Sequence, residues 1–450
     1  MARTKKEAAL TPEERLQAAL VPDWEWPYKL PENWCWTTVG AINQYEGISA
    51  DPTKAKNETF ELYSVPSSAD NYPEIVLGAD IGSAKQSVKK GDVLLCKINP
   101  RINRVWKVSK YTDHSLLASS EWIVIRNSRL ISNYLMWCLR SPYFRGYMLS
   151  NVSGVGGSLM RAQPKFVQGY PIPVPPLAEQ QRIVDRIESL FAKLDEAKEK
   201  AQAVVDSFET RKAAILHKAF TGELTAKWRE EHDVGMESWE HHQFSDLCAI
   251  VRGGSPRPAG DPRYYDGNIP FMKVADITRN DSPYVSKVEY SIKEEGLKKT
   301  RMVEENTLLL TNSGATLGVP AITTIRTTFN DGIAAFIGLD IDSLLFYYYF
   351  WTSKTAFLRS INMGAAQPNL NTKLIGEVEI DVPQTAERVE IARVLNALLS
   401  EEQQAKEAAE AVLDQIDLMK KSILARAFRG ELGTNDPSEE SAMELLKRVL

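Results

Sequence analysis

The chain has 450 residues, of which 43% are hydrophobic and 25% charged, and its formal net charge is -5. These are ordinary globular values, and the length predicts two or three domains rather than one. It has no apolar run of membrane-spanning length, no secretory leader and no Cys or His spacing typical of a disulfide framework or a zinc site, so we expect a cytoplasmic protein with reduced cysteines and no metal.

The first 30 residues form an N-terminal extension (1–30) that has no counterpart later in the chain. Residues 31–174 are predicted to form a first head, a mixed α/β module. Short runs such as "DVLLCKI" and "EWIVIRN", broken by Gly, Pro and Asn, favour β-strands, whereas "NYLMWCLRS" favours a helix.

The most informative stretch of this head is "KINPRINRVWKVSK", from Lys97 to Lys110, which holds five cations and no acid. Cations bind phosphates, and Arg and Asn also pair with the edges of guanine and adenine. The glycine-rich "SGVGGSLMRAQPKF" lets a ligand approach its backbone closely. A solvated basic hairpin is the alternative. The candidate DNA contacts of this head are Lys97, Asn99, Arg101, Asn103, Arg104, Lys107, Ser158, Arg161 and Gln163.

Residues 175–224 are predicted to form a long helix. Apolar side chains recur at the 3-4 spacing of a coiled-coil seam, the stretch begins at a proline pair, and it ends near Gly222. At 1.5 Å per residue such a helix is roughly 60 Å long, and its apolar stripe needs a partner. The predicted seam residues are Ile187, Leu190, Leu194, Ala201, Val204 and Phe208.

A linker (225–237) leads to a second head (238–382) of the same kind. Its runs "IPFMKVADI", "NTLLLTN" and "AAFIGLDI" favour strands, and "SLLFYYYFWTS" favours a helix. Polar residues follow the strands, although for each of them a turn or cap role is an equal alternative. The candidate DNA contacts of this head are Arg252, Arg257, Lys273, Thr311, Asn312, Ser313, Thr316, Gln367 and Asn369.

A second long helix is predicted over residues 383–432, followed by a C-terminal tail (433–450). Its seam contains one acid, Glu402, at the position where the first helix has Leu194, and the first seam contains one cation, Arg211. The acid is interpreted as fixing the helical register, as marking a partner contact, or as a tolerated defect. The predicted seam residues are Leu395, Leu398, Ala409, Val412, Ile416 and Ile423.

The two long helices repeat one another. With an offset of 208, residues 175–224 match residues 383–432 at roughly 20 of 50 positions, and "ILHKAFTGEL" returns as "ILARAFRGEL". Looser matches upstream extend the repeat to the heads. Because the connections are short, the helices must run antiparallel, with one head at each end of the rod. We therefore expect an α+β (mixed α/β) protein with two pseudo-symmetric heads separated by a long antiparallel two-helix coiled coil.

The sequence offers no catalytic motif. "DPRY" has Arg263 where an adenine methyltransferase loop requires proline. The chain has no Gly-rich phosphate-binding loop that ends in Lys followed by Ser or Thr. Ser158 lacks the glycine that a nucleophile elbow requires after its serine. The five histidines form no metal pattern.

These features together resemble the specificity (S) subunits of type I restriction-modification enzymes. The resemblance covers nearly the whole chain and rests on "PIPVPPLAEQQRIVDRIESLF", the repeated "ILHKAFTGEL" and "ILARAFRGEL", "PYKLPENWCWTTVG", "GDVLLCKINPRINRV", "GNIPFMKVADI" and "GAAQPNL".

The resemblance implies that each head is a target recognition domain for one half of a split, asymmetric double-stranded DNA sequence. It also implies a non-catalytic role in phage defence. The chain itself would bind no cofactor; two methyltransferase (M) subunits would dock on the long helices and use S-adenosylmethionine to methylate adenine N6, while restriction (R) subunits would use ATP and Mg²⁺. A protein-interaction scaffold without DNA specificity is one alternative, and a self-sufficient enzyme is another.

Overall fold

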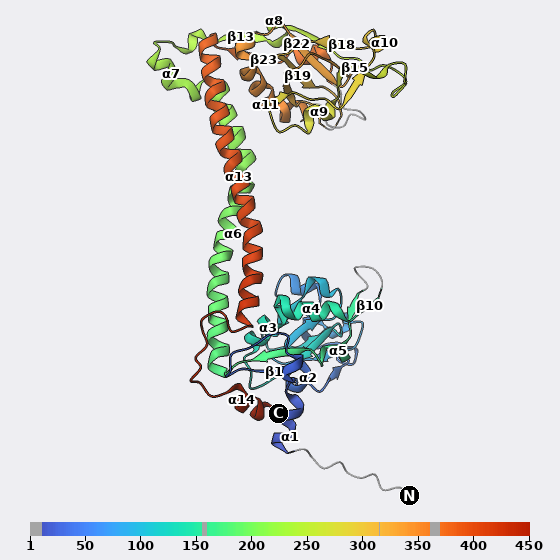
Figure 1. Cartoon of the computed structure of the whole chain (residues 1–450), viewed down its shortest axis with the longest axis vertical. Helices are drawn as coiled ribbons and strands as arrows, with labels where there is room; N and C mark the ends of the chain where they lie inside the picture. The colour runs from blue at the N-terminus through green and yellow to red at the C-terminus, as the bar shows by residue number, and fades with distance from the viewer. Residues whose placement is uncertain (1–10, 155–159, 315, 361–369) are drawn as a thin grey trace. The chain divides into compact units, whose positions relative to one another are not determined.

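The computed structural model describes residues 11–154, 160–314, 316–360 and 370–450 (Figure 1). The chain divides into two compact units. The first contains residues Met1–Ala201 and Ala411–Leu450, and the second contains Gln202–Glu410. Each unit combines several small β-sheets with helices, so the expected α+β class is confirmed.

The first unit holds the first head, whose strands form a five-stranded sheet in the order β2-β5-β8-β3-β4, a three-stranded sheet in the order β7-β6-β9, and the pairs β1-β12 and β10-β11. Its strands are β1 (Cys35–Thr38), β2 (Ser49–Ala50), β3 (Thr59–Tyr63), β4 (Glu74–Leu77), β5 (Lys85–Ser87), β6 (Val93–Cys96), β7 (Val105–Lys107), β8 (Ser115–Ala118), β9 (Trp122–Ile125), β10 (Val152–Ser153), β11 (Arg161–Ala162) and β12 (Pro171–Val174). Its short helices are α1 (Pro12–Ala19), α2 (Val39–Ile42), α3 (Ser132–Arg140), α4 (Pro142–Ser150), α5 (Pro164–Val167) and α14 (Ala442–Val449).

The second unit holds the second head, with sheets in the orders β14-β22-β19-β20-β16 and β17-β15-β21-β18 and the pair β13-β23. Its strands are β13 (Glu240–Gln243), β14 (Ala249–Arg252), β15 (Tyr265–Met272), β16 (Tyr284–Val285), β17 (Tyr290–Ile292), β18 (Arg301–Val303), β19 (Thr307–Thr311), β20 (Pro320–Thr323), β21 (Thr327–Phe329), β22 (Ile333–Ile337) and β23 (Glu379–Val382). Its short helices are α7 (Ala226–Glu231), α8 (Phe244–Leu247), α9 (Val274–Thr278), α10 (Glu294–Leu297), α11 (Leu344–Ser360) and α12 (Thr372–Gly376).

The two heads share a core of corresponding strands, although their complete strand orders differ. In each head a central, fully buried strand (β6 or β19) pairs antiparallel with the next strand along the chain (β7 or β20) and with a later one (β9 or β22). In each head the first strand pairs antiparallel with the last, β1 with β12 and β13 with β23. A strand that is covered on both faces is apolar at every position, and the centres of the runs "DVLLCKI" and "NTLLLTN" have this pattern. The structure confirms the predicted strands as β6 and β19, both of which are buried throughout. The repeat detected in the sequence is therefore a repeat of structure.

One predicted strand ends early. In "IPFMKVADI" only the first half is extended, in β15, and the second half forms α9. The carboxylate of Asp276 accepts a hydrogen bond from the backbone N–H of Lys273 at 2.7 Å. This cap satisfies a helix-start donor and turns the chain into a helix where the apolar pattern alone suggested a strand.

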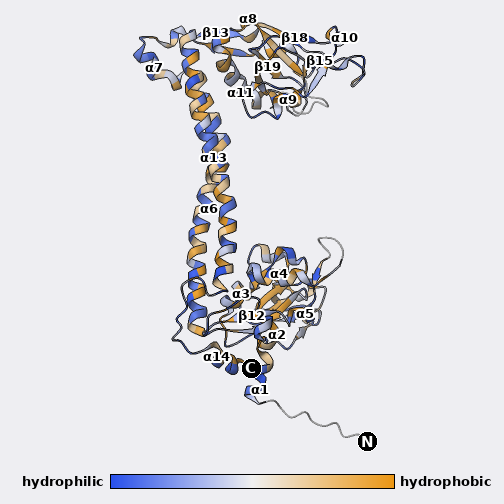
Figure 2. Ribbon diagram, in the orientation of Figure 1, coloured by the Kyte–Doolittle hydropathy of each residue, from blue (hydrophilic) through white to orange (hydrophobic). Residues whose placement is uncertain are grey.

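The two predicted long helices are present as α6 (Leu177–Phe220) and α13 (Thr385–Ala427). In the first unit Asp195 and Lys198 of α6 pair with Lys420 and Asp417 of α13. In the second unit Phe208 and Arg211 of α6 contact Lys406 and Glu402 of α13. Within each unit positions rise along one helix as they fall along the other, so the helices pack antiparallel there. Figure 2 shows hydrophobic residues recurring between hydrophilic ones along both helices.

The seam differs from the predicted one on α13. Ala409 and Ile416 are buried, but Val412 is 40% exposed and the adjacent Leu413 is half-buried in its place. Lys406, which was not predicted in the seam, is half-buried, and its ammonium lies 4.8 Å from the centre of the Phe208 ring. A lysine stem covers apolar surface at a position that a simple apolar count skips. The predicted residues on α6 lie buried or half-buried, as do Leu395, Leu398 and Ile423.

The charged seam residues of the two helices meet. Arg211 Nε donates to Glu402 Oε2 at 2.7 Å, and a second guanidinium nitrogen donates to the carbonyl of Val204 at 3.2 Å. Leu194 and Met419 occupy the corresponding positions of the repeat. The second unit thus has an ion pair where the first has two apolar residues, and the acid in the seam is matched rather than unpaired.

We expect a double-mutant cycle to show that these two charges act on one another. Arg211→Met or Glu402→Leu alone should destabilise the paired helices of the second unit by about 1–2 kcal/mol, because each leaves a partly buried group without its partner. The double variant should lie within about 1 kcal/mol of the parent, since it recreates the apolar pair of the other repeat. Hydrogen exchange of peptides from α6 and α13 measures this, and additive effects would show that the residues do not interact.

The end of each long helix is fixed by the repeated motif. After α6 and α13 the chain turns at Gly222 (φ 80°) and Gly430 (φ 74°), a left-handed conformation that favours glycine. Just before the turns, Phe220 packs 5.4 Å from the ring of Phe346 in the second unit, and Phe428 packs 5.4 Å from the ring of Tyr134 in the first. The motif therefore anchors one helix end in each head.

A buried glutamate marks the first turn of each long helix. Glu179 of α6 accepts from the hydroxyl of Thr434 at 2.6 Å, and Glu387 of α13 accepts from the hydroxyl of Thr225 at 2.7 Å. Both glutamates have no exposed surface. Burial raises the pKa of Glu179, although Thr434 and Arg182 oppose that shift. Each glutamate thereby ties the start of one long helix to the segment that follows the end of the other.

The N-terminal extension and the C-terminal tail pack together in the first unit. Helix α1 lies beside α14 (Figure 1), and Arg15 donates to the backbone oxygen of Leu450 at 3.2 Å. In the first head the indole of Trp34 donates to the side-chain oxygen of Asn435 in the tail at 3.0 Å. Arg182 holds Glu439 through two hydrogen bonds of 2.8 Å. These contacts close the first unit with segments from both ends of the described chain.

Candidate nucleic-acid interface

The basic stretch of the first head connects β6 to β7 as an irregular loop. Asn99 (φ 44°) and Asn103 (φ 52°) both adopt the left-handed conformation and enclose one short 3-10 turn, Pro100–Ile102. Among residues other than glycine, asparagine tolerates this conformation best. The two asparagines that suggested adenine recognition therefore also shape the loop. Asn103 Nδ2 donates to the carbonyl of Arg140 at 3.2 Å, which holds the loop against α3.

The cations of this loop fall into two groups. Lys97 Nζ donates to the carbonyl of Ser120 at 2.7 Å, and Lys107 Nζ donates to Asn133 Oδ1 at 2.5 Å, so both are bound within the head. Arg101 is exposed, and its guanidinium has no partner among the described residues, while Arg104 is half-buried beside Cys96. Arg101 is thus the cation of the loop that is most available to a ligand.

The segment around Gln163 lies directly beside this loop. The backbone N–H of Ala162 donates to the carbonyl of Lys97 at 2.8 Å, and that of Asn99 donates to the carbonyl of Met160 at 2.8 Å. Arg161 is exposed and lies 3.4 Å from Glu121, and Gln163 is half-buried at the start of α5. The structure therefore brings together the two polar stretches of the first head.

Two residues of this surface were missed in the sequence. Lys165 and Phe166 are exposed on α5, and the ammonium of Lys165 lies 4.8 Å from the centre of the Phe166 ring. A cation beside an exposed aromatic ring suits a strand of nucleic acid. Both belong to the quoted "MRAQPKF", so their proximity to the predicted site was the only available signal.

The second head has the equivalent loop between β19 and β20. The backbone N–H of Leu370 donates to the carbonyl of Asn312 at 2.7 Å, which repeats the link between Ala162 and Lys97 in the first head. Thr311 is fully buried; its hydroxyl donates to the carbonyl of Thr316 at 2.7 Å and accepts from the N–H of Val319 at 2.9 Å. Its side chain serves to close the loop. The side chain of Thr316 is exposed.

Asn312 is fully buried, and neither polar atom of its amide has a hydrogen-bond partner among the described residues. Its backbone N–H donates to the carbonyl of Gly332 at 2.9 Å. A buried amide without hydrogen-bond partners costs free energy, so the packing of the surrounding residues must keep the Asn312 side chain in this position. Ser313 beside it is half-buried.

The turn 330–332 binds the two predicted arginines of the second head. Arg252 Nε donates to the carbonyl of Asp331 at 2.7 Å, and Arg257 lies 3.5 Å from the Asp331 carboxylate. Burial opposes ionisation of Asp331, but Ser255, Arg257 and Arg252 outweigh it and lower the pKa of its carboxyl. Lys273 lies 3.1 Å from the centre of the Tyr290 ring. The sequence did not single out Asp331.

Three of the predicted contacts, Ser158, Gln367 and Asn369, lie outside the described residues. Within the described part of the chain no group of three or more His, Cys, Asp or Glu residues is arranged to hold a metal ion. No helix of that part is long and apolar enough to cross a membrane.

The described residues of both candidate sites are cations, amides and hydroxyl groups on one loop and its neighbouring segments. Such groups are suited to bind phosphates and the edges of bases.

A family model described as "Type I restriction modification DNA specificity domain" matches residues 38–205 and 236–411 of this chain. The StySPI specificity subunit of a type I restriction enzyme from Salmonella potsdam is 26% identical over 321 residues, covering 68% of this chain and 67% of the relative. The EcoKI specificity subunit from Escherichia coli K12 is 24% identical, covering 72% of this chain and 73% of the relative.

Two solved structures have a similar fold. The crystal structure of the HsdS subunit from Thermoanaerobacter tengcongensis superimposes with a TM-score of 0.66 at 22% identity, covering 91% of this chain and all of that one. A chain from a structure titled "Structural basis underlying complex assembly and conformational transition of the type I R-M system" gives a TM-score of 0.70 at 22% identity, covering 90% of this chain and all of that one.

Proposed function

Because the chain belongs to the type I restriction-modification DNA specificity subunits, and so supplies DNA specificity without catalysis, we propose that it reads an asymmetric target in two parts, one with each head. The observation that carries the proposal is the repeated site. Each head presents a loop after its central buried strand, joined by a backbone hydrogen bond to a second segment near Gln163 or near Leu370. Since the loop residues differ between the heads, the two half-sites should differ.

The paired long helices support a fixed spacer between the half-sites. The helices are 44 and 43 residues long and pack antiparallel within each unit along apolar and ionic contacts, and we propose that they hold the two heads at one separation. Readers held at one distance recognise sites at one separation, and about one DNA turn, on the order of 34 Å, separates sites read from the same face.

We further propose that the long helices dock two M subunits, which carry the S-adenosylmethionine chemistry, and that R subunits complete the complex with ATP and Mg²⁺. One strongly exposed apolar residue of α13 supports a docking role, because Leu418 is 63% exposed. Exposed apolar side chains of this size are found at protein interfaces.

The first experiment is base-resolution sequencing of methylated adenines in the native host, with and without the gene for this chain. A split motif that disappears on deletion gives both half-sites and the spacer. If no motif depends on the chain, the two-part reading fails. The scaffold alternative predicts DNA affinity that barely depends on salt, and the self-sufficient enzyme predicts methyl transfer by the purified chain alone.

We expect Arg101→Ala and Arg104→Ala to act on the first half-site alone. If the arginine contacts a base, its removal should relax specificity at one position of the half-site and cost about 1–3 kcal/mol of binding free energy. If it contacts a phosphate, its removal should weaken binding to all sequences alike and flatten the slope of log K against log salt by about one. Binding titrations over a range of salt, with every base of each half-site varied in turn, distinguish the two results.

Lys54→Ala is the matched control, because Lys54 is an exposed cation of the same head whose ion pair with Asp51 is 3.8 Å long. It should change neither specificity nor salt slope. If both arginine variants behave like this control, the loop assignment is wrong.

A further inference from the structure

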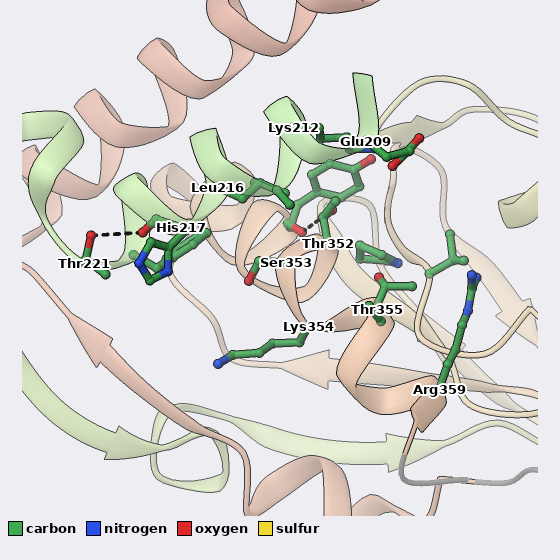
Figure 3. Close-up of a pocket in the computed structure, with 16 residues that line it drawn as sticks. Glu209, Lys212, Leu216, His217, Thr221, Thr352, Ser353, Lys354, Thr355 and Arg359 are labelled. Carbon is green, nitrogen blue, oxygen red and sulfur yellow. Dashed lines mark hydrogen bonds between the residues drawn. The ribbon is translucent and has the colours of Figure 1, made fainter. Parts of the chain in front are cut away.

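A polar cleft lies in the second unit between helices α6 and α11. It has a volume of about 710 Å³ and is lined from α6 by Lys212, Leu216 and His217, and from α11 by Thr352 and Lys354, among others. Figure 3 shows these side chains on the two facing helices, with Arg359 at one end. None of the predicted contact residues that the structure describes lines it.

The cleft is positively charged although the chain as a whole is negative. Lys212, His217, Lys354 and Arg359 line it, against one carboxylate, Glu209. Among the described residues neither the two lysines, nor Arg359, nor His217 forms an ion pair. Arg359 donates to a carbonyl, and the ammonium of Lys354 lies 5.2 Å from the Phe350 ring. Lysines without acidic partners, facing one cavity, are arranged for an anionic ligand.

The cleft adjoins the loop after β19. The hydroxyl of Thr355 donates to the carbonyl of Gly318 at 2.6 Å, and Arg359 Nε donates to the carbonyl of Leu317 at 3.1 Å. Val319 and Pro320, which follow that loop, form part of the cleft wall. A molecule that contacts the loop therefore has the cleft next to it.

We propose that this cleft binds the sugar-phosphate backbone of the DNA whose bases the second head reads. The inference rests on the proposed function, and it adds the long helix α6 to the DNA-binding surface. Lysine is a compact charge on a flexible stem, which suits a phosphate rather than a base edge. The contact positions the duplex for the loop and carries no sequence information.

Helix polarity offers a simpler role for some of these cations. His217 lies in the last turn of α6 and Arg359 in the last turn of α11, where a positive charge complements the helix dipole. Lys212 lies about two turns before the end of α6, beyond the reach of that effect. Lys212 and Lys354 are therefore the residues to test.

The test measures DNA affinity of the full chain, in its complex with the M subunits, as a function of salt. Lys212→Ala and Lys354→Ala should each flatten the plot of log K against log salt by about 0.9, and weaken binding by roughly 5- to 10-fold near 0.1 M salt. The loss should be equal for target and non-target duplexes, and Lys212→Arg should retain the parent slope. Lys218→Ala is the control, because Lys218 is an exposed cation of α6 that does not line the cleft.

Each outcome decides between the claims. If both variants keep the parent salt slope while target preference is intact, the cleft does not bind DNA and the proposed function stands. If they impair assembly with the M subunits but leave the slope unchanged, the cleft belongs to a protein contact and the inference is overturned. If the parent complex itself shows no sequence preference, the proposed function fails.

Discussion

Glu387→Ala is expected to destabilise the second unit by about 3–5 kcal/mol, because it leaves a buried cation without its partner. Arg229 donates to Glu387 Oε1 at 2.6 Å, Trp239 donates to Oε2 at 3.1 Å, and the arginine is only 8% exposed. Hydrogen exchange should show faster exchange in peptides from the second head and the adjoining ends of α6 and α13.

The matched control is Glu410→Ala on the same helix. Glu410 is exposed, and its i,i+4 contact with Lys406 is 3.9 Å long, so its loss should cost under about 0.5 kcal/mol. Glu387→Gln retains acceptor and donor atoms without the charge and should fall between the two. Equal effects of the two alanine variants would show that the buried network contributes nothing to the junction.

Phe428→Ala should destabilise the first unit by a comparable amount, about 3–5 kcal/mol, because it opens a cavity where a fully buried ring has been removed. The ring contacts Tyr134 of α3, and the backbone carbonyl of the same residue accepts from the hydroxyl of Tyr28 at 3.0 Å. The end of α13 and the first head should both become labile to hydrogen exchange, while peptides of the second unit stay protected.

Phe428→Leu should recover part of the loss, since it fills most of the cavity. Phe357→Ala tests the same chemical change at a side chain that is 53% exposed, and it should alter stability by less than about 0.5 kcal/mol. If Phe428→Ala were as mild as Phe357→Ala, the repeated motif would not anchor the helix as we infer.

The sequence predicted those elements that depend on local pattern. The long helices, their limits near Gly222 and Gly430, and the central strands of both heads follow from periodicity, helix-end residues and apolar runs. The seam on α13 was partly misread, since Val412 is exposed while the half-buried Lys406 lies over the ring of Phe208. A periodicity count does not weigh the aliphatic part of a charged side chain.

The sites were harder to predict, because they depend on contacts between distant segments. Asn99 and Gln163 were each chosen for their chemistry, but the backbone hydrogen bonds that place Lys97–Asn99 beside Met160–Ala162 follow only from the tertiary fold. No pattern in the sequence predicted that the N-terminal extension packs against the tail. Thr311 was predicted as a DNA contact because it is a polar residue at the end of a strand. Its hydroxyl instead forms hydrogen bonds with Thr316 and Val319 of the same loop, so Thr311 is not among the proposed contacts.

Under the proposed function, the two left-handed asparagines of the loop between β6 and β7 separate the positions that hold its shape from those that would meet the target. Asn99 and Asn103 must keep a residue that accepts positive φ, while Arg101 and Ile102 between them are exposed and can be exchanged without disturbing the hairpin. If the loop reads the target as proposed, single substitutions at its tip would produce new target sequences on a head that stays folded. For a defence system facing viruses that evade a given motif, such a loop allows specificity to change faster than structure.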